Sequence, residues 1–237
     1  MAPFADHASF VDPTNFANTY ISYYPYGAAL GLALDLSLRS NFDDVSLDDF
    51  MREMWQAHGT TEANYDTDDL ESALARVTGD SKFAAEFFRR FVSGQDLPDY
   101  EELLSNAGLL IKKTKEGNAS VGPVELEFVG HDAMVTNNTI VGSPIYKAGI
   151  DRGDQIVAIG RLEIGSQEQW DAAMERYDPG MTVTIRFRQR EVEKEAQLTL
   201  VEDNQISVVK FEDEDEPLRK SMQRFRDQWL GADSETD

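Results

Sequence analysis

The chain has 237 residues, enough for one or two domains that each bury a hydrophobic core. Asp and Glu number 44 against 22 Lys and Arg, and the net charge of −22 disfavours nucleic acid and anionic membrane surfaces as partners, because like charges repel. The absence of cysteine excludes disulfides and thiol catalysis. Since that absence suits both the bacterial cytoplasm and the periplasm, the compartment stays open.

The first predicted element is an apolar helix that follows a cluster of tyrosines. Residues 22–39 read Ser-Tyr-Tyr-Pro-Tyr-Gly-Ala-Ala-Leu-Gly-Leu-Ala-Leu-Asp-Leu-Ser-Leu-Arg, a helix that is apolar nearly all round and therefore buried. Its apolar part is too short to cross a bilayer and contains Asp35, so we expect no membrane insertion. The first residues lack a basic start, and any export signal would lie upstream.

Helical periodicity continues to about Lys112. Ser46 is a good N-cap with acidic residues after it, and a second acidic first turn follows Thr67. Four further helices are expected from these caps, from the apolar spacing and from closing glycines: 46–58, 67–78, 81–91 and 98–104. We interpret their aromatic stripes as core packing.

Beyond residue 111 the composition changes. Residues 111–121 are rich in Lys, Thr, Gly, Asn and Ser, which predicts a linker. Alternating patterns then predict strands over 124–129, 133–141, 155–159, 182–187 and 196–201, with one amphipathic helix over 167–177. These elements indicate a small β-barrel with a helix.

Residues 142–159 carry a glycine-punctuated motif. They closely match the pattern G-S-P-A-x-x-A-G-L-x-x-G-D-x-I-x-x-I, in which Gly149 ends a one-turn helix and Gly153 makes the turn before a strand. This motif resembles that of bacterial PDZ domains.

The PDZ resemblance implies that an extended peptide is captured beside the loop at 120–123. Peptide contact is then expected from Val121, Gly122 and Val124, with a purely structural turn as the alternative. Pro123 has no N–H group, which weakens the loop as a cradle for a terminal carboxylate. The groove would then bind an internal segment, bind weakly or dock on the preceding helical domain.

The last residues form a tail. An acidic run over 212–216 precedes an apolar stripe with helical spacing, made of Leu218, Met222, Phe225 and Trp229. We expect this helix to pack back on the protein, with partner binding as the alternative. Residues 232–237 are expected to be disordered.

The tyrosine cluster carries a second resemblance. Its Tyr-x-x-Gly-Ala entry into a buried helix is similar to the segment of gluzincin aminopeptidases in which a tyrosine hydroxyl faces the zinc-bound substrate. Residues 21–39 resemble more specifically the glycyl aminopeptidase family, which joins a thermolysin-like catalytic domain to a PDZ domain. The resemblance implies that Tyr24 is catalytic and donates to the oxyanion. Two alternatives are that Tyr23 faces the substrate, or that both tyrosines only anchor the helix. Many relatives carry lysine where this chain has Tyr26.

The zinc motif of that family is missing. Its H-E-x-x-H helix has no counterpart, because the histidines His7, His58 and His131 do not have that spacing. The chain therefore resembles the carboxy-terminal part of a metallopeptidase. We expect no metal or cofactor in this chain, zinc in the full-length protein and no activity of the chain alone.

The expected fold class is multi-domain α plus β. Residues 1–112 are assigned to an all-α helical subdomain of a thermolysin-like catalytic domain, 113–206 to a PDZ β-barrel-like domain, and 207–237 to the acidic segment and terminal helix. The family resemblance implies cleavage of peptides with amino-terminal Gly or Ala. The expected partners are a peptide substrate or ligand and the upstream catalytic portion of the same polypeptide. Alternatives are a non-catalytic PDZ adaptor and a structural fragment.

Overall fold

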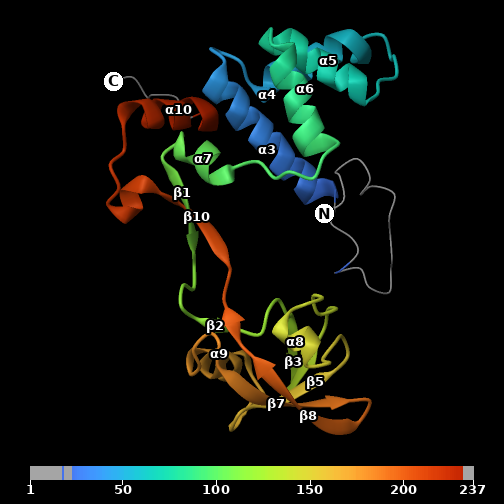
Figure 1. Cartoon of the computed structure of the whole chain (residues 1–237), viewed down its shortest axis with the longest axis vertical. Helices are drawn as coiled ribbons and strands as arrows, with labels where there is room; N and C mark the ends of the chain where they lie inside the picture. Colours follow the sequence, from blue (N-terminus) through green and yellow to red (C-terminus); the bar gives the residue numbers. More distant parts are fainter. Residues whose placement is uncertain (1–17, 19–22, 232–237) are drawn as a thin grey trace. The chain divides into compact units, whose positions relative to one another are not determined.

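A computed structural model describes Asn18 and residues 23–231 of the chain. It is a mixed α/β structure that divides into two compact units (Figure 1). The helical unit contains the described residues 23–112 and 208–231, and the sheet unit contains Asn18 and residues 113–207. Residues 113–207 of the sheet unit are thus inserted in sequence between two parts of the helical unit.

The helical unit has six α-helices among its described residues: α3 (Tyr23–Asn41), α4 (Leu47–Met54), α5 (Thr67–Thr78), α6 (Ser81–Phe87), α7 (Tyr100–Ser105) and α10 (Lys220–Leu230). Two π-helical turns, Trp55–Gly59 and Phe88–Val92, lengthen α4 and α6, so the predicted helices over 46–58 and 81–91 each change pitch within their length. A 3-10 turn, Phe211–Glu214, precedes α10.

Local capping sets the helix ends. The Ser46 N–H donates to Asp49 at 2.9 Å, and the Asp66 carboxylate accepts the N–H groups of Asp68 and Asp69 at the start of α5. Gly79, with φ +67°, ends α5 in the left-handed conformation. The core beneath these helices is built from α3, α4, α5 and α6 and contains Leu30, Leu34, Leu38, Phe50, Met54, Leu74, Phe87 and Phe88.

The sheet unit is built around an antiparallel sheet of order β3-β4-β5-β7-β8. Its strands are β3 (Leu126–Val129), β4 (Asp132–Val135), β5 (Gln155–Ile159), β7 (Thr182–Gln189) and β8 (Val192–Thr199), with β6 (Leu162–Glu163) beside β5. The short helix α8 (Pro144–Lys147) and the longer α9 (Gln167–Glu175) complete the unit, and Trp170 of α9 joins its core.

The structure corrects the expected β-barrel. The sheet is open, with β3 and β8 at its two edges, and none of the described sheets closes. The predicted strand 133–141 stops at Val135, because Thr139 turns away and donates its N–H to Asp151 at 2.9 Å and its hydroxyl to Ile150 at 2.8 Å.

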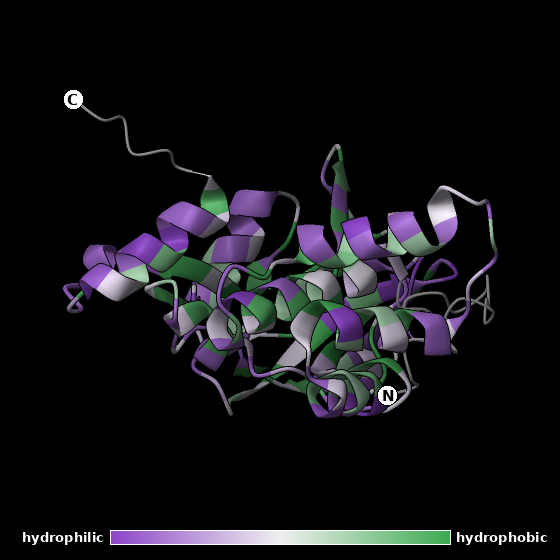
Figure 2. Ribbon diagram, turned by 90° about the horizontal axis from the view of Figure 1, so that it is seen from above, coloured by the Kyte–Doolittle hydropathy of each residue, from purple (hydrophilic) through white to green (hydrophobic). Residues whose placement is uncertain are grey.

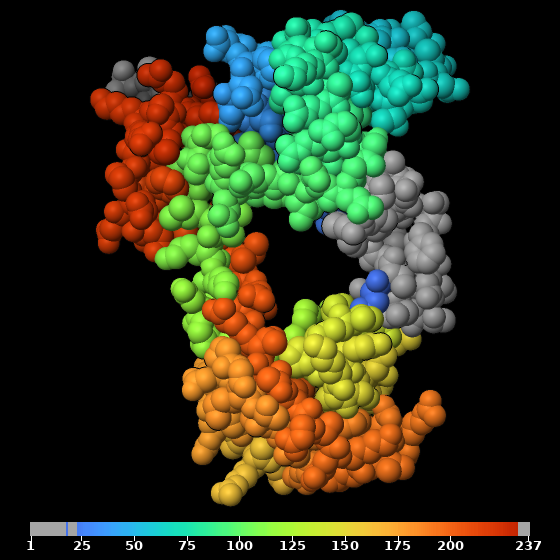
Figure 3. All heavy atoms as spheres, viewed as in Figure 1, coloured from blue at the N-terminus to red at the C-terminus, as the bar shows by residue number. Residues whose placement is uncertain are grey.

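The predicted linker is also partly strand. Residues 109–113 form β1, which pairs with β10 (Ile206–Lys210), and Ala119–Ser120 form β2, which pairs with β9 (Val201–Glu202). The strands β1 and β10 run side by side in Figure 3. The region 1–112, which was expected to be all-α, therefore contains most of strand β1. Residues 208–231 also belong to this helical unit, although they lie far along the chain.

Much of the ribbon in Figure 2 is purple, which marks hydrophilic residues, in agreement with the 28% of charged residues in the chain. Among the described residues, no helix has the length and apolar character that a bilayer crossing requires.

Candidate functional site

The tyrosine cluster occupies the first turn of α3. Pro25 is tolerated there because the first N–H groups of a helix have no partner within the helix. Tyr24 is 72% exposed and Tyr23 41% exposed, and their ring centroids lie 4.3 Å apart with the planes tilted by 30°. Within the described part of the chain, the Tyr24 hydroxyl makes no hydrogen bond. It is therefore available to an external acceptor.

A fourth tyrosine near this turn was not predicted from the sequence. Tyr100 begins α7, which packs against α3. Burial, with a smaller electrostatic contribution from Tyr26, raises the pKa of Tyr100 above its usual value. The Tyr100 phenol therefore stays protonated at neutral pH, close to Tyr26. Tyr26 and Tyr100 are 74 positions apart, and no sequence pattern indicates that they lie close together.

No described residues form a group of three or more His, Asp or Glu side chains that could hold a metal ion. The His58 ring packs edge-on against Tyr65 at 5.7 Å, and its Nδ1 is buried without a hydrogen-bond partner. His131 lies in the turn between β3 and β4, and His7 lies outside the described residues. The described side chains therefore do not fit a zinc ion.

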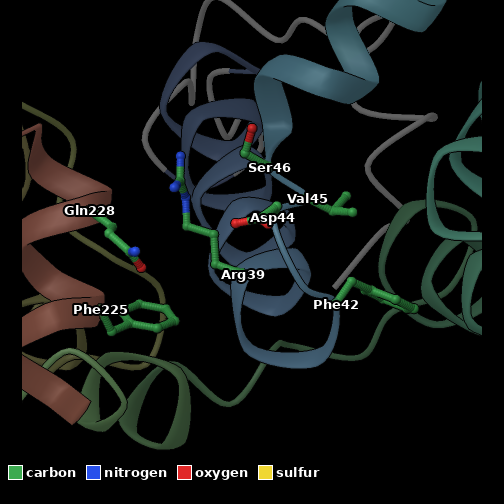
Figure 4. Close-up of a pocket in the computed structure, with 7 residues that line it drawn as sticks. All are labelled: Arg39, Phe42, Asp44, Val45, Ser46, Phe225 and Gln228. Atoms are coloured by element: carbon green, nitrogen blue, oxygen red, sulfur yellow. The ribbon is translucent and has the colours of Figure 1, made fainter.

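A pocket of about 280 Å³ lies in the helical unit (Figure 4). Its walls come from the end of α3, the loop after it and α10: Arg39, Phe42, Asp44, Val45, Ser46, Phe225 and Gln228. Arg39 pairs with Asp35 at 3.0 Å, and Asp35 also accepts the Leu47 N–H at 2.9 Å. These contacts fix the loop against α3.

In the predicted peptide-binding loop, the Gly122 N–H already has a partner within the loop. The Gly122 N–H donates to the Ser120 hydroxyl at 3.0 Å, and the Val121 carbonyl accepts the Ile145 N–H at 3.0 Å. Val121 itself is 1% exposed, with its side chain in the core. Gly122 has φ +89°, and a Cβ there would lie 2.6 Å from the Ser143 Cβ, so the position requires glycine. Val124 is partly buried against the same core.

The outer edge of β3 offers backbone groups for pairing. The Val135 N–H in β4 donates to the Asp154 carbonyl, and the Val135 carbonyl accepts the Gly153 N–H. Val135 therefore makes no backbone hydrogen bond to Leu126, its neighbour in β3. Pairs alternate along an antiparallel ladder, so the backbone groups of Leu126 and Phe128 point away from β4. Among the described strands, none pairs with that edge.

The chain resembles known proteins at the level of solved structures. No family model matches it, and no curated protein matches it significantly. A solved aminopeptidase N family protein from Idiomarina loihiensis is similar at 24% identity with a TM-score of 0.74, over 90% of this chain and 37% of that chain. The chain therefore has the fold of part of an aminopeptidase N family protein. It spans little more than a third of that protein's length.

Two solved proteases resemble a smaller share of the chain. An HtrA-type protease, AlgW with a decapeptide, matches at 15% identity over 36% of this chain and 30% of its own, with a TM-score of 0.34. A serine endoprotease from Yersinia pestis matches at 18% identity over 37% of this chain and 30% of its own, with a TM-score of 0.30. At these scores the likeness supports no functional statement.

Proposed function

We propose that this chain is the carboxy-terminal part of a zinc-dependent aminopeptidase of the glycyl aminopeptidase type, acting on peptides with amino-terminal Gly or Ala. The observation that carries the proposal is the likeness to the aminopeptidase N family protein over 90% of the chain. The exposed tyrosine turn at the start of α3 supports it, because the sequence of that turn resembles the substrate-facing segment of such enzymes.

Tyr24 is proposed to donate a hydrogen bond to the oxyanion that forms at the scissile carbonyl. A phenol has an unperturbed pKa of about 10, so it is neutral and able to donate at pH 7. Its position in the first turn also places it near the positive end of the helix dipole, which favours developing negative charge. A single well-placed donor of this kind typically contributes about 10²–10³ in rate.

The metal would be supplied from elsewhere in the enzyme. When bound, zinc would polarise the scissile carbonyl and lower the pKa of a water molecule. Since the described side chains do not form a zinc site, we assign the ligands and the general base to the upstream catalytic portion of the same polypeptide. On this proposal the 237-residue chain is inactive alone.

The role of Tyr24 is tested in the longer enzyme with aminoacyl-anilide substrates. Tyr24→Phe removes only the hydroxyl, so we expect kcat to fall about 10²–10³-fold with little change in KM. Tyr23→Phe, next to it in the same turn, is the matched control and should cost less than about tenfold. Reversed effects would assign the role to Tyr23, and no effect from either change would leave the cluster as a helix anchor.

A second candidate function, a non-catalytic PDZ adaptor, is favoured by the open edge of β3. Here the sheet unit would bind an extended peptide along Leu126 and Phe128, with Val121, Gly122 and Val124 at the end of the groove. Because the Gly122 N–H is already used and Pro123 has none, amidation of a peptide's carboxyl terminus should change its affinity by less than about threefold. A loss of tenfold or more on amidation would mean that the loop does hold a carboxylate.

A further inference from the structure

The pocket of the helical unit has a lining of mixed character (Figure 4). Its volume is about 280 Å³, just below the range of about 300–1,000 Å³ that drug-sized ligands occupy. The apolar side chains of the lining are Phe42, Val45 and Phe225, and the polar ones are Arg39, Asp44, Ser46 and Gln228. The pocket therefore suits a small molecule that has both an apolar and a polar part.

The positive charge of Arg39 is cancelled within the protein. The Arg39 Nε donates to the Asp35 carboxylate at 3.0 Å, and only 24% and 14% of the two side chains are exposed. The Ser46 hydroxyl is also occupied, since it donates to Asp49 at 2.7 Å, and Asp49 pairs with Arg52 at 2.7 Å. Both ion pairs join opposite charges, so neither arginine leaves a net positive charge beside the pocket.

The carboxylate of Asp44 is left without a partner. It makes no hydrogen bond or ion pair with any residue that the structure describes, and the residue is exposed. In Figure 4 this carboxylate points from the loop toward the side of the pocket formed by α10, from which the Gln228 side chain extends. Since Arg39 and Asp35 cancel each other, the charge of Asp44 is not compensated at the pocket.

The backbone holds Asp44 in place. Its φ is +56°, in the left-handed region that aspartate and asparagine tolerate better than most residues with a Cβ. The end of the same loop is fastened to α3, because the Leu47 N–H donates to Asp35 at 2.9 Å. A carboxylate that is positioned before a ligand arrives costs less conformational freedom on binding.

Two helix ends add negative potential at the same place. Arg39 lies in the last turn of α3, and Gln228 lies in the last turn of α10. The carboxyl end of a helix carries a partial negative charge, equivalent to about half an elementary charge. The amino end of α4 has the opposite sign, but the Asp49 carboxylate accepts the Ser46 N–H there at 2.9 Å. The local field therefore favours a cation.

Phe225 supplies a free aromatic surface. The Phe42 ring is already engaged, since it packs edge-on against Phe83 at 5.0 Å. Phe225 is partly buried and contacts no aromatic ring that the structure describes, and in Figure 4 its ring extends from α10 toward the pocket. An aromatic face attracts a second ring as well as a cation. The free ring and the free carboxylate thus come from different walls of the pocket.

We propose that this pocket binds a small aromatic amine, with its ammonium group paired with the Asp44 carboxylate and its ring against Phe225. An alkyl ammonium group of this kind is charged at neutral pH, because its pKa is about 10, as for lysine. The Gln228 side chain offers an amide oxygen as a second acceptor for the same group. This site goes beyond the proposed peptidase function and does not depend on it.

The test is an NMR titration of the isotope-labelled 237-residue chain with phenethylamine at neutral pH and low salt. We expect saturable binding with a Kd of about 1 mM and the largest shifts at the amides of residues 42–46 and 225–228. Phenethyl alcohol, which has a hydroxyl in place of the ammonium group, should bind about five- to tenfold more weakly. Phenylacetate should not bind. Acetylated and amidated lysine represents a protein side chain and should bind more weakly than phenethylamine, because it has no ring.

Substitutions in the same chain locate the charge. Asp44→Asn should raise the Kd for phenethylamine about five- to tenfold and leave the melting temperature nearly unchanged, because asparagine also tolerates left-handed backbone. Asp43→Asn is the matched control: it removes the same charge from the exposed neighbour outside the lining and should change the Kd less than about twofold. Phe225→Leu should raise the Kd about two- to tenfold.

Four results would contradict the proposal. Equal affinity for phenethyl alcohol, or equal effects of Asp44→Asn and Asp43→Asn, would overturn the pairing with Asp44. Tighter binding of the lysine derivative would overturn the assignment to a small aromatic amine and point to a side chain of a partner protein. Shifts centred elsewhere, or no saturable binding up to about 20 mM, would overturn the site.

Discussion

The junction between α7 and β1 gives a sharp test of how the terminal helix is held. Gly108 follows α7 with φ +65°, and a Cβ built on it would lie 2.4 Å from the Leu218 Cδ1. Gly108→Ala therefore has two costs. Left-handed backbone costs about 1–2 kcal/mol for a residue with a Cβ. Overpacking typically adds about 1–3 kcal/mol, here near the lower end because Leu218 is half-buried and its side-chain end can shift.

We therefore expect Gly108→Ala to lower the free energy of unfolding by about 2–4 kcal/mol. Gly79→Ala is the matched control, because Gly79 has φ +67° but no atom within 4 Å of an added Cβ. It should show only the backbone cost of about 1–2 kcal/mol. The measurement is urea unfolding followed by far-UV circular dichroism and by the combined fluorescence of the three tryptophans, one of which is Trp229 in α10.

The steric part should disappear when its partner is shortened. In a Leu218→Ala background, the cost of Gly108→Ala should fall by about 1 kcal/mol, a coupling of the size seen for residues in contact. If the losses in free energy of unfolding from the two single substitutions add to within about 0.3–0.5 kcal/mol, Leu218 does not contact Gly108, and the packing of residue 218 against this turn is refuted.

Three further outcomes are expected. The buried side chain of Arg226 in α10 donates hydrogen bonds to Glu212 and lowers the pKa of Glu212 to about 2. This ion pair therefore stabilises the folded state fully above the usual pKa of a carboxyl group, and the stabilisation is lost as pH falls toward 2. The stability deficit of Glu212→Gln should therefore shrink between about pH 5 and pH 2, and a constant deficit would contradict the pairing. Thr139→Val should cost about 1–3 kcal/mol by leaving the Ile150 carbonyl unpaired, whereas Thr139→Ser keeps the donor; equal losses would contradict this. Trypsin should cut first at Lys115, in the exposed turn between β1 and β2, and earlier cleavage within the helices would contradict the division into units.

Elements fixed by local chemistry were predictable from the sequence. Asp66 and Gly79 bound α5 through a cap and a left-handed glycine, and both signals lie within the segment itself. Gly149 and Gly153 have φ of +80° and +91°, as expected for the ends of a one-turn helix and a turn. The motif around them therefore folds as its spacing indicates.

Elements that depend on distant partners were missed. The segment at 111–121 is typical of a linker in sequence, because the strands that pair with β1 and β2 lie some ninety positions later, in β10 and β9. Arg226 carries no sign of burial in the sequence, since its place beside Glu212 depends on how α10 docks.

The central claim, that this chain contributes Tyr24 but not the metal site to an aminopeptidase, is tested most directly on the purified 237-residue chain. Elemental analysis and an aminoacyl-anilide assay should be run on the same sample before and after treatment with a chelator. We expect no stoichiometric zinc and no hydrolysis, because the described side chains form no metal site. One equivalent of tightly held zinc together with activity that the chelator abolishes would contradict it.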